Sequence, residues 1–247
     1  MNDDILIANW QRVNKQVSDA CVQAGNLTAD HESFDKLESS RVISSKVKLL
    51  AVSKTKPASM IATLAKQGQR DFGENYFQEA IEKIKALQQQ PETEQIVWHY
   101  IGHIQRNKTR DIAENFDWVQ TLERDIIAKR LNDQRPEGMA PLNVLIQLNI
   151  DDEDSKSGCR PEDLPDLIAA IKEYERLQLR GLMIIPAKAD TNAFERTKQL
   201  FEEVRQRHPD LHSWDTLSMG MSNDMVTAIA SGSTMVRVGT AIFGERE

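Results

Sequence analysis

Short apolar runs alternate along most of the chain with segments whose apolar residues recur at helical spacing. The runs are rich in Val, Ile and Leu and are bounded by polar or turn-forming residues, which is typical of strands buried on both faces. These predicted strands span residues 47–53, 70–75, 97–102, 118–122, 143–150, 179–185, 216–220 and 235–239. The predicted helices between them span residues 57–67, 76–90, 104–115, a segment from 125 onward, 161–174, 193–207 and 223–231.

This alternation predicts an α/β fold with parallel strands, because a helix that follows each strand returns the chain to the same end of the sheet. Eight such units close naturally into a (β/α)8 TIM-type barrel. The alternative is an open doubly wound sheet, but no G-x-G-x-x-G follows the first strand. Residues 4–24 predict an extra N-terminal helix, and residues 25–46 a polar loop or a partly ordered insert. We therefore expect one barrel domain over residues 1–247, with the N-terminal helix and the insert in 1–46 and the barrel in 47–247.

Composition restricts the kinds of partner and the compartment. The net charge is −7 and the pI is about 5.4, so the chain lacks the basic face that nucleic acid or an anionic membrane would need. Cys21 and Cys159 form neither a disulfide framework nor a metal-binding motif. The N-terminus is acidic and has no signal-peptide pattern, and no apolar run approaches a membrane span. We expect a cytoplasmic protein that binds no metal, nucleic acid or membrane.

A lysine stands out at the end of the first predicted strand, where barrels carry their functional side chains. Strand residues alternate between faces, so Lys54 shares a face with Val52 and points into the barrel if Val52 does. Burial and nearby cations favour the free amine that a Schiff-base nucleophile needs. The candidate cations are Lys56, Lys108 and Arg237. A solvated lysine just past the strand remains the alternative.

The turns after the seventh and eighth predicted strands offer groups that bind anions. Gly220 permits close backbone approach, Ser222 offers a hydroxyl before a helix, and Gly239 and Thr240 add a second turn of this kind. Barrels commonly bind phosphate at these two turns. Ser222 could instead cap the helix that follows. Arg237, two residues before Gly239 on the same face, requires an acceptor, either a ligand's pyridine nitrogen or a core carboxylate.

Several ordered motifs run from about residue 47 to the C-terminus. They are Ala51-Val-Ser-Lys54-Thr-Lys-Pro57, Phe72-Gly-Glu-Asn75-Tyr76, His99-Tyr-Ile-Gly102-His-Ile-Gln105-Arg-Asn107-Lys108, Ser155-Lys-Ser-Gly158, Arg180-Gly-Leu-Met183, Leu217-Ser-Met-Gly-Met-Ser222 and Val236-Arg-Val-Gly-Thr240. This series resembles the pyridoxal phosphate homeostasis protein family, which is similar in fold to the N-terminal barrel of alanine racemase. The polar insert before Val47 is longer than that family leads us to expect.

The resemblance implies a site for pyridoxal 5′-phosphate (PLP). It implies that Lys54 carries PLP as a Schiff base, that Asn75 lies beside the cofactor and that Arg237 faces the pyridine nitrogen. The residues that it assigns to the phosphate are Ser222, Gly239 and Thr240, with Ser218 nearby.

Two functions share this barrel and lysine: a PLP carrier or buffer, which the resemblance implies, and an amino-acid racemase. A racemase of this fold uses a second, β-rich domain that supplies a tyrosine base from the partner subunit. Here the chain ends seven residues after Thr240, and its three tyrosines, Tyr76, Tyr100 and Tyr174, fall within the barrel. We therefore expect the second base of a racemase to be absent, and a monomer is favoured.

Arg237 also argues against catalysis, because an arginine leaves the ring nitrogen unprotonated and weakens the cofactor as an electron sink. A barrel used only for protein interaction would leave Lys54 and the phosphate turns unexplained. We expect a non-catalytic PLP-binding protein that buffers PLP or delivers it to apo PLP-dependent enzymes. The sequence leaves residual PLP-dependent activity and the recipient enzymes open.

Overall fold

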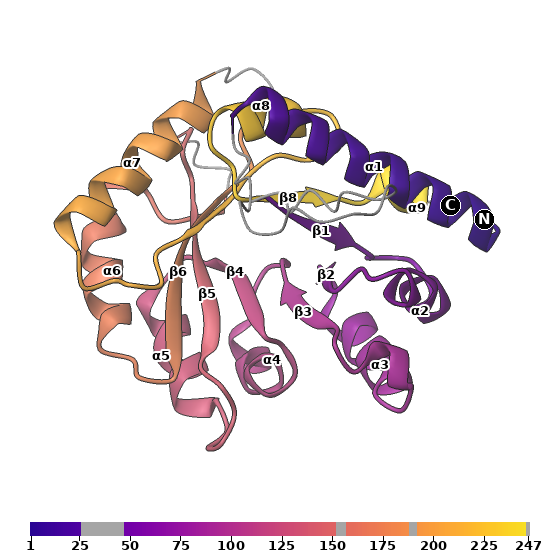
Figure 1. The fold of residues 1–247 in the computed structure, drawn as a ribbon. Helices are drawn as coiled ribbons and strands as arrows, with labels where there is room; N and C mark the ends of the chain where they lie inside the picture. The colour runs from indigo at the N-terminus through magenta and orange to yellow at the C-terminus, as the bar shows by residue number, and fades with distance from the viewer. Residues whose placement is uncertain (26–46, 152–156, 188–191, 246–247) are drawn as a thin grey trace, which may run out of the picture.

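The protein forms a closed eight-stranded barrel in a computed structural model that describes residues 1–25, 47–151, 157–187 and 192–245 (Figure 1). Each strand pairs in parallel with the next, and β1 pairs with β8. The strands are β1 Lys48–Val52, β2 Asp71–Glu74, β3 Val97–Tyr100, β4 Trp118–Leu122, β5 Leu142–Leu148, β6 Leu177–Ile184, β7 Thr216–Ser218 and β8 Met235–Val238. The predicted barrel is confirmed, and the open-sheet alternative is wrong.

The helices that connect the strands lie where the apolar spacing predicts them. They are α2 Ala58–Lys66, α3 Phe77–Leu87, α4 Thr109–Asn115, α5 Asp125–Gln134, α6 Leu164–Lys172, α7 Ala193–Arg207 and α8 Met225–Ala230. The starts of two predicted helices are 3-10 turns instead, η2 Arg106–Lys108 before α4 and η3 Pro161–Asp163 before α6, and another 3-10 turn, η1, spans Pro91–Thr93. A short helix after β8, α9 Thr240–Phe243, was not predicted, because four residues show no periodicity. No helix in the described part of the chain is both long and apolar enough to cross a lipid bilayer.

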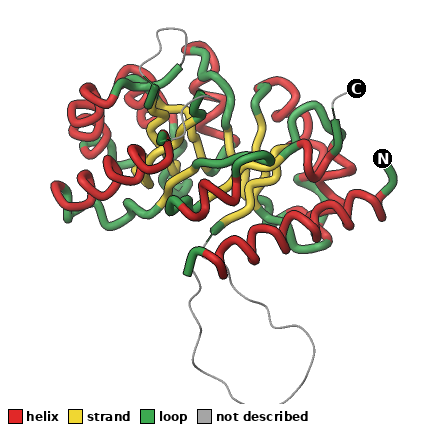
Figure 2. The backbone as a smooth tube through the Cα atoms, turned by 90° about the horizontal axis from the view of Figure 1, so that it is seen from above, coloured by secondary structure: helices red, strands yellow, loops and turns green. Residues whose placement is uncertain are grey.

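The additional N-terminal helix, α1 Asp3–Gln23, is present and lies across the side of the barrel where β1 meets β8 (Figures 1 and 2). Its start is capped by the Asn2 side chain, which accepts a hydrogen bond from the Ile5 N–H at 2.9 Å. The buried face of α1 packs against α2, α8 and α9. The predicted polar insert falls largely in residues 26–46, outside the described residues.

Apolar clusters are smaller inside the barrel than in the layer between the strands and the helices. The main apolar core lies between the strands and the helices, whereas the inward-facing side chains form two small separate clusters. Those clusters are Leu50, Val52, Ile101 and Met235, and Trp118, Leu145 and Met183. Between them lie buried polar side chains, including His99, Gln120, Ser218 and Arg237. Polar groups this deeply buried require partners, and Ser218 bonds to both Gln120 and Arg237.

Candidate functional site at the carboxyl ends of the strands

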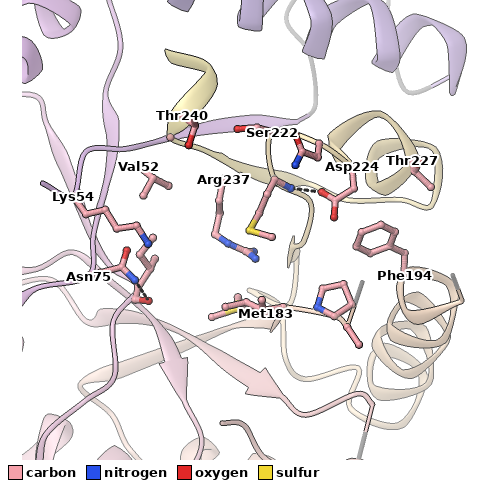
Figure 3. Close-up of a pocket in the computed structure, with 17 residues that line it drawn as sticks. Val52, Lys54, Asn75, Met183, Phe194, Ser222, Asp224, Thr227, Arg237 and Thr240 are labelled. Atoms are coloured by element: carbon pink, nitrogen blue, oxygen red, sulfur yellow. Dashed lines mark hydrogen bonds between the residues drawn. The ribbon is translucent and has the colours of Figure 1, made fainter. Parts of the chain in front are cut away.

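A cavity of about 730 Å³ opens where the strands end, a size that suits a small ligand (Figure 3). Most of its polar lining comes from the turns after β1, β2, β7 and β8. Six of the seven predicted site residues line it: Lys54, Asn75, Ser222, Arg237, Gly239 and Thr240. Ser218 does not line the cavity, because its side chain lies deeper in the barrel, where it is fully buried.

Lys54 lies two residues past the end of β1, and its side chain points into the cavity beside Asn75 (Figure 3). The backbone turns sharply there, since Thr55 has a φ of 63°, in the left-handed region that β-branched residues rarely adopt. The Thr55 N–H donates to Glu79 Oε1 at 2.6 Å. Helix α3, which carries Glu79, therefore fixes the turn that presents the lysine.

A buried ion-pair cluster supports the same turn from below. The Lys83 ammonium donates to the Ser53 carbonyl at 2.8 Å and to Glu74 Oε1 at 2.8 Å, and Ser53 Oγ donates to the same carboxylate oxygen at 2.6 Å. Burial raises the pKa of Glu74 even though Lys83 opposes this shift. Sequence reasoning missed these partners; the only available signal was a lysine four residues after Glu79 on a predicted helix.

Of the three cations expected near Lys54, only Arg237 lines the cavity with it. Lys56 is directed elsewhere, and its ammonium donates to the Glu245 carbonyl at 2.7 Å. The Lys108 ammonium lies 5.0 Å from the centre of the Phe77 ring. Of the three predicted cations, Arg237 is therefore the one that lies near Lys54 in the cavity.

Asn75 presents an unused acceptor in the cavity wall. Its Nδ2 donates to the Ile101 carbonyl at 3.4 Å, whereas its buried Oδ1 has no hydrogen-bond partner among the described residues. The backbone just after β3 lies very close to the backbone of Asn75, since a Cβ on Gly102 would lie 2.0 Å from the Asn75 carbonyl oxygen. Only glycine fits at Gly102. A buried acceptor left unsatisfied next to a cavity is what a ligand-binding residue shows before its ligand is bound.

The turns after β7 and β8 bring two hydroxyls to the same side of the cavity (Figure 3). In the part of the chain that the structure describes, neither Ser222 nor Thr240 has a hydrogen-bond partner for its hydroxyl. The alternative role of Ser222 as a helix cap is wrong, because α8 begins after Asp224. Asp224 instead accepts a hydrogen bond from the Met221 N–H at 2.6 Å, which ties the turn together. A Cβ on Gly239 would lie 3.2 Å from a carbonyl oxygen of β1, so this turn has little room for a side chain.

Arg237 is buried at the centre of the cavity wall, between Lys54 and the turn after β7 (Figure 3). Its Nη1 donates to the carbonyl and the hydroxyl of Ser218 at 2.7 and 2.9 Å, and its Nη2 donates to the Ile184 carbonyl at 2.8 Å. Burial lowers the pKa of Arg237 to about 10, although Asp224 opposes this shift, so the side chain is cationic at neutral pH. These bonds use three of the five N–H donors of a guanidinium. The partners are carbonyls and a hydroxyl, so the core-carboxylate alternative is wrong for the described residues.

Below the cavity, Ser218 continues into a buried polar layer. Its Oγ donates to Gln120 Oε1 at 2.6 Å, Gln120 Nε2 lies 3.0 Å from His99 Nδ1, and His99 Nε2 lies 2.9 Å from Asp71 Oδ1. Burial lowers the pKa of His99, although Asp71 opposes this shift. Sequence reasoning missed Gln120 and His99 as partners of the site; a polar residue at an inward position of an apolar strand was the available signal.

We expect acid to destabilise the fold through His99. The folded protein holds this side chain neutral, with a pKa below the ordinary 6.5, while the unfolded chain takes up a proton as the pH falls through 6.5. Stability is therefore fully present above that value and is lost as the pH falls below it, by no more than about 1.4 kcal/mol for each pH unit. Urea unfolding at pH 7.5 and 5.5 measures the loss, and a His99→Asn variant should lose less over the same interval. Equal losses in the two proteins would contradict this assignment.

Several known proteins are similar to this chain in sequence. A family model described as the alanine racemase N-terminal domain matches residues 36–247. The pyridoxal phosphate homeostasis protein of Haemophilus influenzae is 56% identical over 205 residues, which cover 81% of this chain and 85% of that protein. This chain belongs to the pyridoxal phosphate homeostasis protein family. The Escherichia coli K12 member is 54% identical over 206 residues, covering 81% of this chain and 86% of that protein.

Solved structures support the same family and fold. The family member PipY of Synechococcus elongatus PCC7942, solved with PLP bound, is 35% identical, with a TM-score of 0.72 over 81% of this chain and 93% of that one. Alanine racemase from Corynebacterium glutamicum has a TM-score of 0.65 at 17% identity, over 99% of this chain and 61% of that one. The similarity to alanine racemase shows only that the two proteins share the barrel fold.

Proposed function

We propose that this protein binds PLP in the cavity through a Schiff base to Lys54 and takes part in intracellular PLP homeostasis, by buffering PLP or delivering it to apo enzymes. The relatives named as PLP homeostasis proteins and the PLP-bound structure of PipY support this proposal. The observation that carries it is the convergence of three kinds of group on one cavity: a lysine, a buried arginine, and the Ser222 and Thr240 hydroxyls, which have no hydrogen-bond partner among the described residues.

The lining residues fit the aldehyde, the pyridine nitrogen and the phosphate of PLP. Lys54 offers an amine for the aldehyde, and the remaining N–H donors of Arg237 suit the lone pair of a pyridine nitrogen. Asn75 Oδ1 is an unsatisfied acceptor that a donor on the ligand would pair. When bound, PLP supplies an aldehyde that reacts with amines and a ring that withdraws electrons.

We assign the phosphate to the turns after β7 and β8. The hydroxyls of Ser222 and Thr240 can each donate a charge-assisted hydrogen bond to a phosphate oxygen. Gly239 keeps the backbone of the second turn close to β1, where a side chain would crowd it. Ser218, which the resemblance placed near the phosphate, is better suited to holding Arg237.

We propose that the site does not support robust catalytic turnover. Arg237 can only donate, so it keeps a pyridine nitrogen unprotonated and blunts the electron sink that most PLP chemistry requires. A second base opposite Lys54 is also lacking among the described residues. No tyrosine lines the cavity; Tyr100 donates to the His103 carbonyl, and Asp224 lies on the far side of Arg237 from Lys54 (Figure 3).

We further propose that residues 1–247 act as one PLP-binding barrel domain, as a monomer, in the cytoplasm. The acidic charge balance supports the absence of nucleic-acid and membrane partners. Both cysteines are buried and form no disulfide, which suits a reducing compartment.

A transfer assay tests the function. The PLP-loaded protein is mixed with an apo PLP-dependent enzyme, and the recovery of that enzyme's activity is compared with recovery from free PLP at equal concentration. We expect the loaded protein to restore activity, because an incoming amine can displace Lys54 from the Schiff base directly, and we expect no amino-acid racemisation. Racemisation on the order of 1 s⁻¹ or faster that Lys54→Ala abolishes would overturn the carrier proposal in favour of the racemase.

A further inference from the structure

A chain of hydrogen bonds crosses the barrel interior from the cavity to the opposite rim. It joins Arg237 on β8, Ser218 on β7, Gln120 on β4, His99 on β3 and Asp71 at the start of β2, through contacts of 2.9, 2.6, 3.0 and 2.9 Å. The first four side chains are buried. The five residues lie on five different strands, so this series of hydrogen bonds can form only when the barrel is closed.

The direction of every bond follows from the guanidinium at one end of this series, the carboxylate at the other and the orientation of the Gln120 amide between them. A guanidinium can only donate, so Ser218 Oγ accepts from Arg237, and the hydroxyl proton of Ser218 goes to Gln120 Oε1. The amide nitrogen of Gln120 then donates to His99 Nδ1, and its second hydrogen faces the sulfur of Met235 at 3.1 Å. His99 therefore carries its proton on Nε2 and donates to the carboxylate that ends the chain.

The reverse orientation of the Gln120 amide is disfavoured on two grounds. Ser218 Oγ would then accept from both Arg237 and Gln120, and its own proton would lose its acceptor. His99 would need a proton on Nδ1, and it could satisfy the carboxylate at Nε2 only by becoming charged. Burial opposes a charged imidazole at this position.

We propose that Gln120 is a positioning residue for the ligand site. It accepts the Ser218 hydroxyl proton, which leaves Ser218 Oγ as an acceptor that holds the Arg237 guanidinium in place to face the ring nitrogen of bound PLP. This inference rests on the proposed function, because it concerns how Arg237 meets the ligand. Arg237 keeps two carbonyl anchors without Gln120, at Ser218 and Ile184. The loss of Gln120 should therefore change the electronic environment of the ligand without abolishing its binding.

The absorption spectrum of bound PLP tests this directly. Gln120→Met and Ser218→Ala should both retain PLP, and both should shift the apparent pKa of the bound chromophore by about half a unit or more, in the same direction as Arg237→Ala. Ser233→Ala is the matched control, since Ser233 is an equally buried serine beside the same strand pair and bonds only to backbone carbonyls. Its titration should match that of the wild type.

A second measurement needs no ligand. ¹⁵N NMR of the apo protein should show His99 as the neutral Nε2–H tautomer, and Gln120→Glu should move a proton onto Nδ1, because a carboxylate cannot donate. A protonated Nδ1 in the wild type, or unchanged PLP titrations in Gln120→Met and Ser218→Ala, would overturn the inference. Failure of the wild type to bind PLP would instead refute the proposed function and leave the tautomer result intact.

Discussion

Lys54→Ala is expected to abolish the covalent attachment of PLP completely. The wild-type protein should be yellow, and borohydride should bleach its visible band and fix the cofactor to one peptide that contains Lys54. The reason is geometric, since Lys54 is the lysine that lines the cavity among the described residues, and its turn is held by α3. Absorption spectra before and after reduction, followed by peptide mass spectrometry, measure the result.

Lys56→Ala is the control for this experiment. Lys56 lies two residues away, but its ammonium bonds to the Glu245 carbonyl, so its removal should leave the band and the labelled peptide unchanged. Labelling at Lys56 or Lys156 in the wild type, or a visible band that survives in Lys54→Ala, would show that the wrong lysine has been assigned.

The double variant Ser222→Ala/Thr240→Ala should weaken PLP binding by roughly a hundredfold or more. Each hydroxyl is available for a hydrogen bond to a charged phosphate, and each such bond contributes about 1.5–3 kcal/mol. Pyridoxal has the same ring and aldehyde but no phosphate, so its affinity should change only slightly. Equilibrium titration with both ligands separates the two contributions.

Thr227→Ala provides the matched control, because Thr227 also lines the cavity but lies beyond Asp224, away from the assigned phosphate turns (Figure 3). It should leave both affinities near the wild-type values. If the double variant lost PLP and pyridoxal affinity equally, the phosphate would have to bind elsewhere.

The sequence was sufficient for the parts of the site that depend on strand ends. Alternation put Lys54 on the face of Val52 and Arg237 on the face of Gly239, and the barrel rule brought Asn75 and Thr240 to the same mouth. These predictions need only the period of each strand and the order of the elements. The structure brings the four residues to one cavity.

The remaining parts depend on contacts between strands that are distant in sequence. The position of Ser218 on its strand allows an inward face. Only the three-dimensional structure shows that its side chain lies below the cavity and bonds to Gln120 and Arg237. In the same way, Lys83 reaches the Ser53 carbonyl only once α3 lies beside the turn that follows β1. Periodicity along one strand carries no information about such partners.

A crystal structure of the protein grown with PLP would test the central claim most directly. We predict continuous density from Lys54 Nζ to the ligand, a phosphate within hydrogen-bond distance of Ser222 Oγ and Thr240 Oγ1, and a ring nitrogen facing Arg237. Density that joins PLP to another lysine, or a ligand whose phosphate lies toward Asn75, would contradict it.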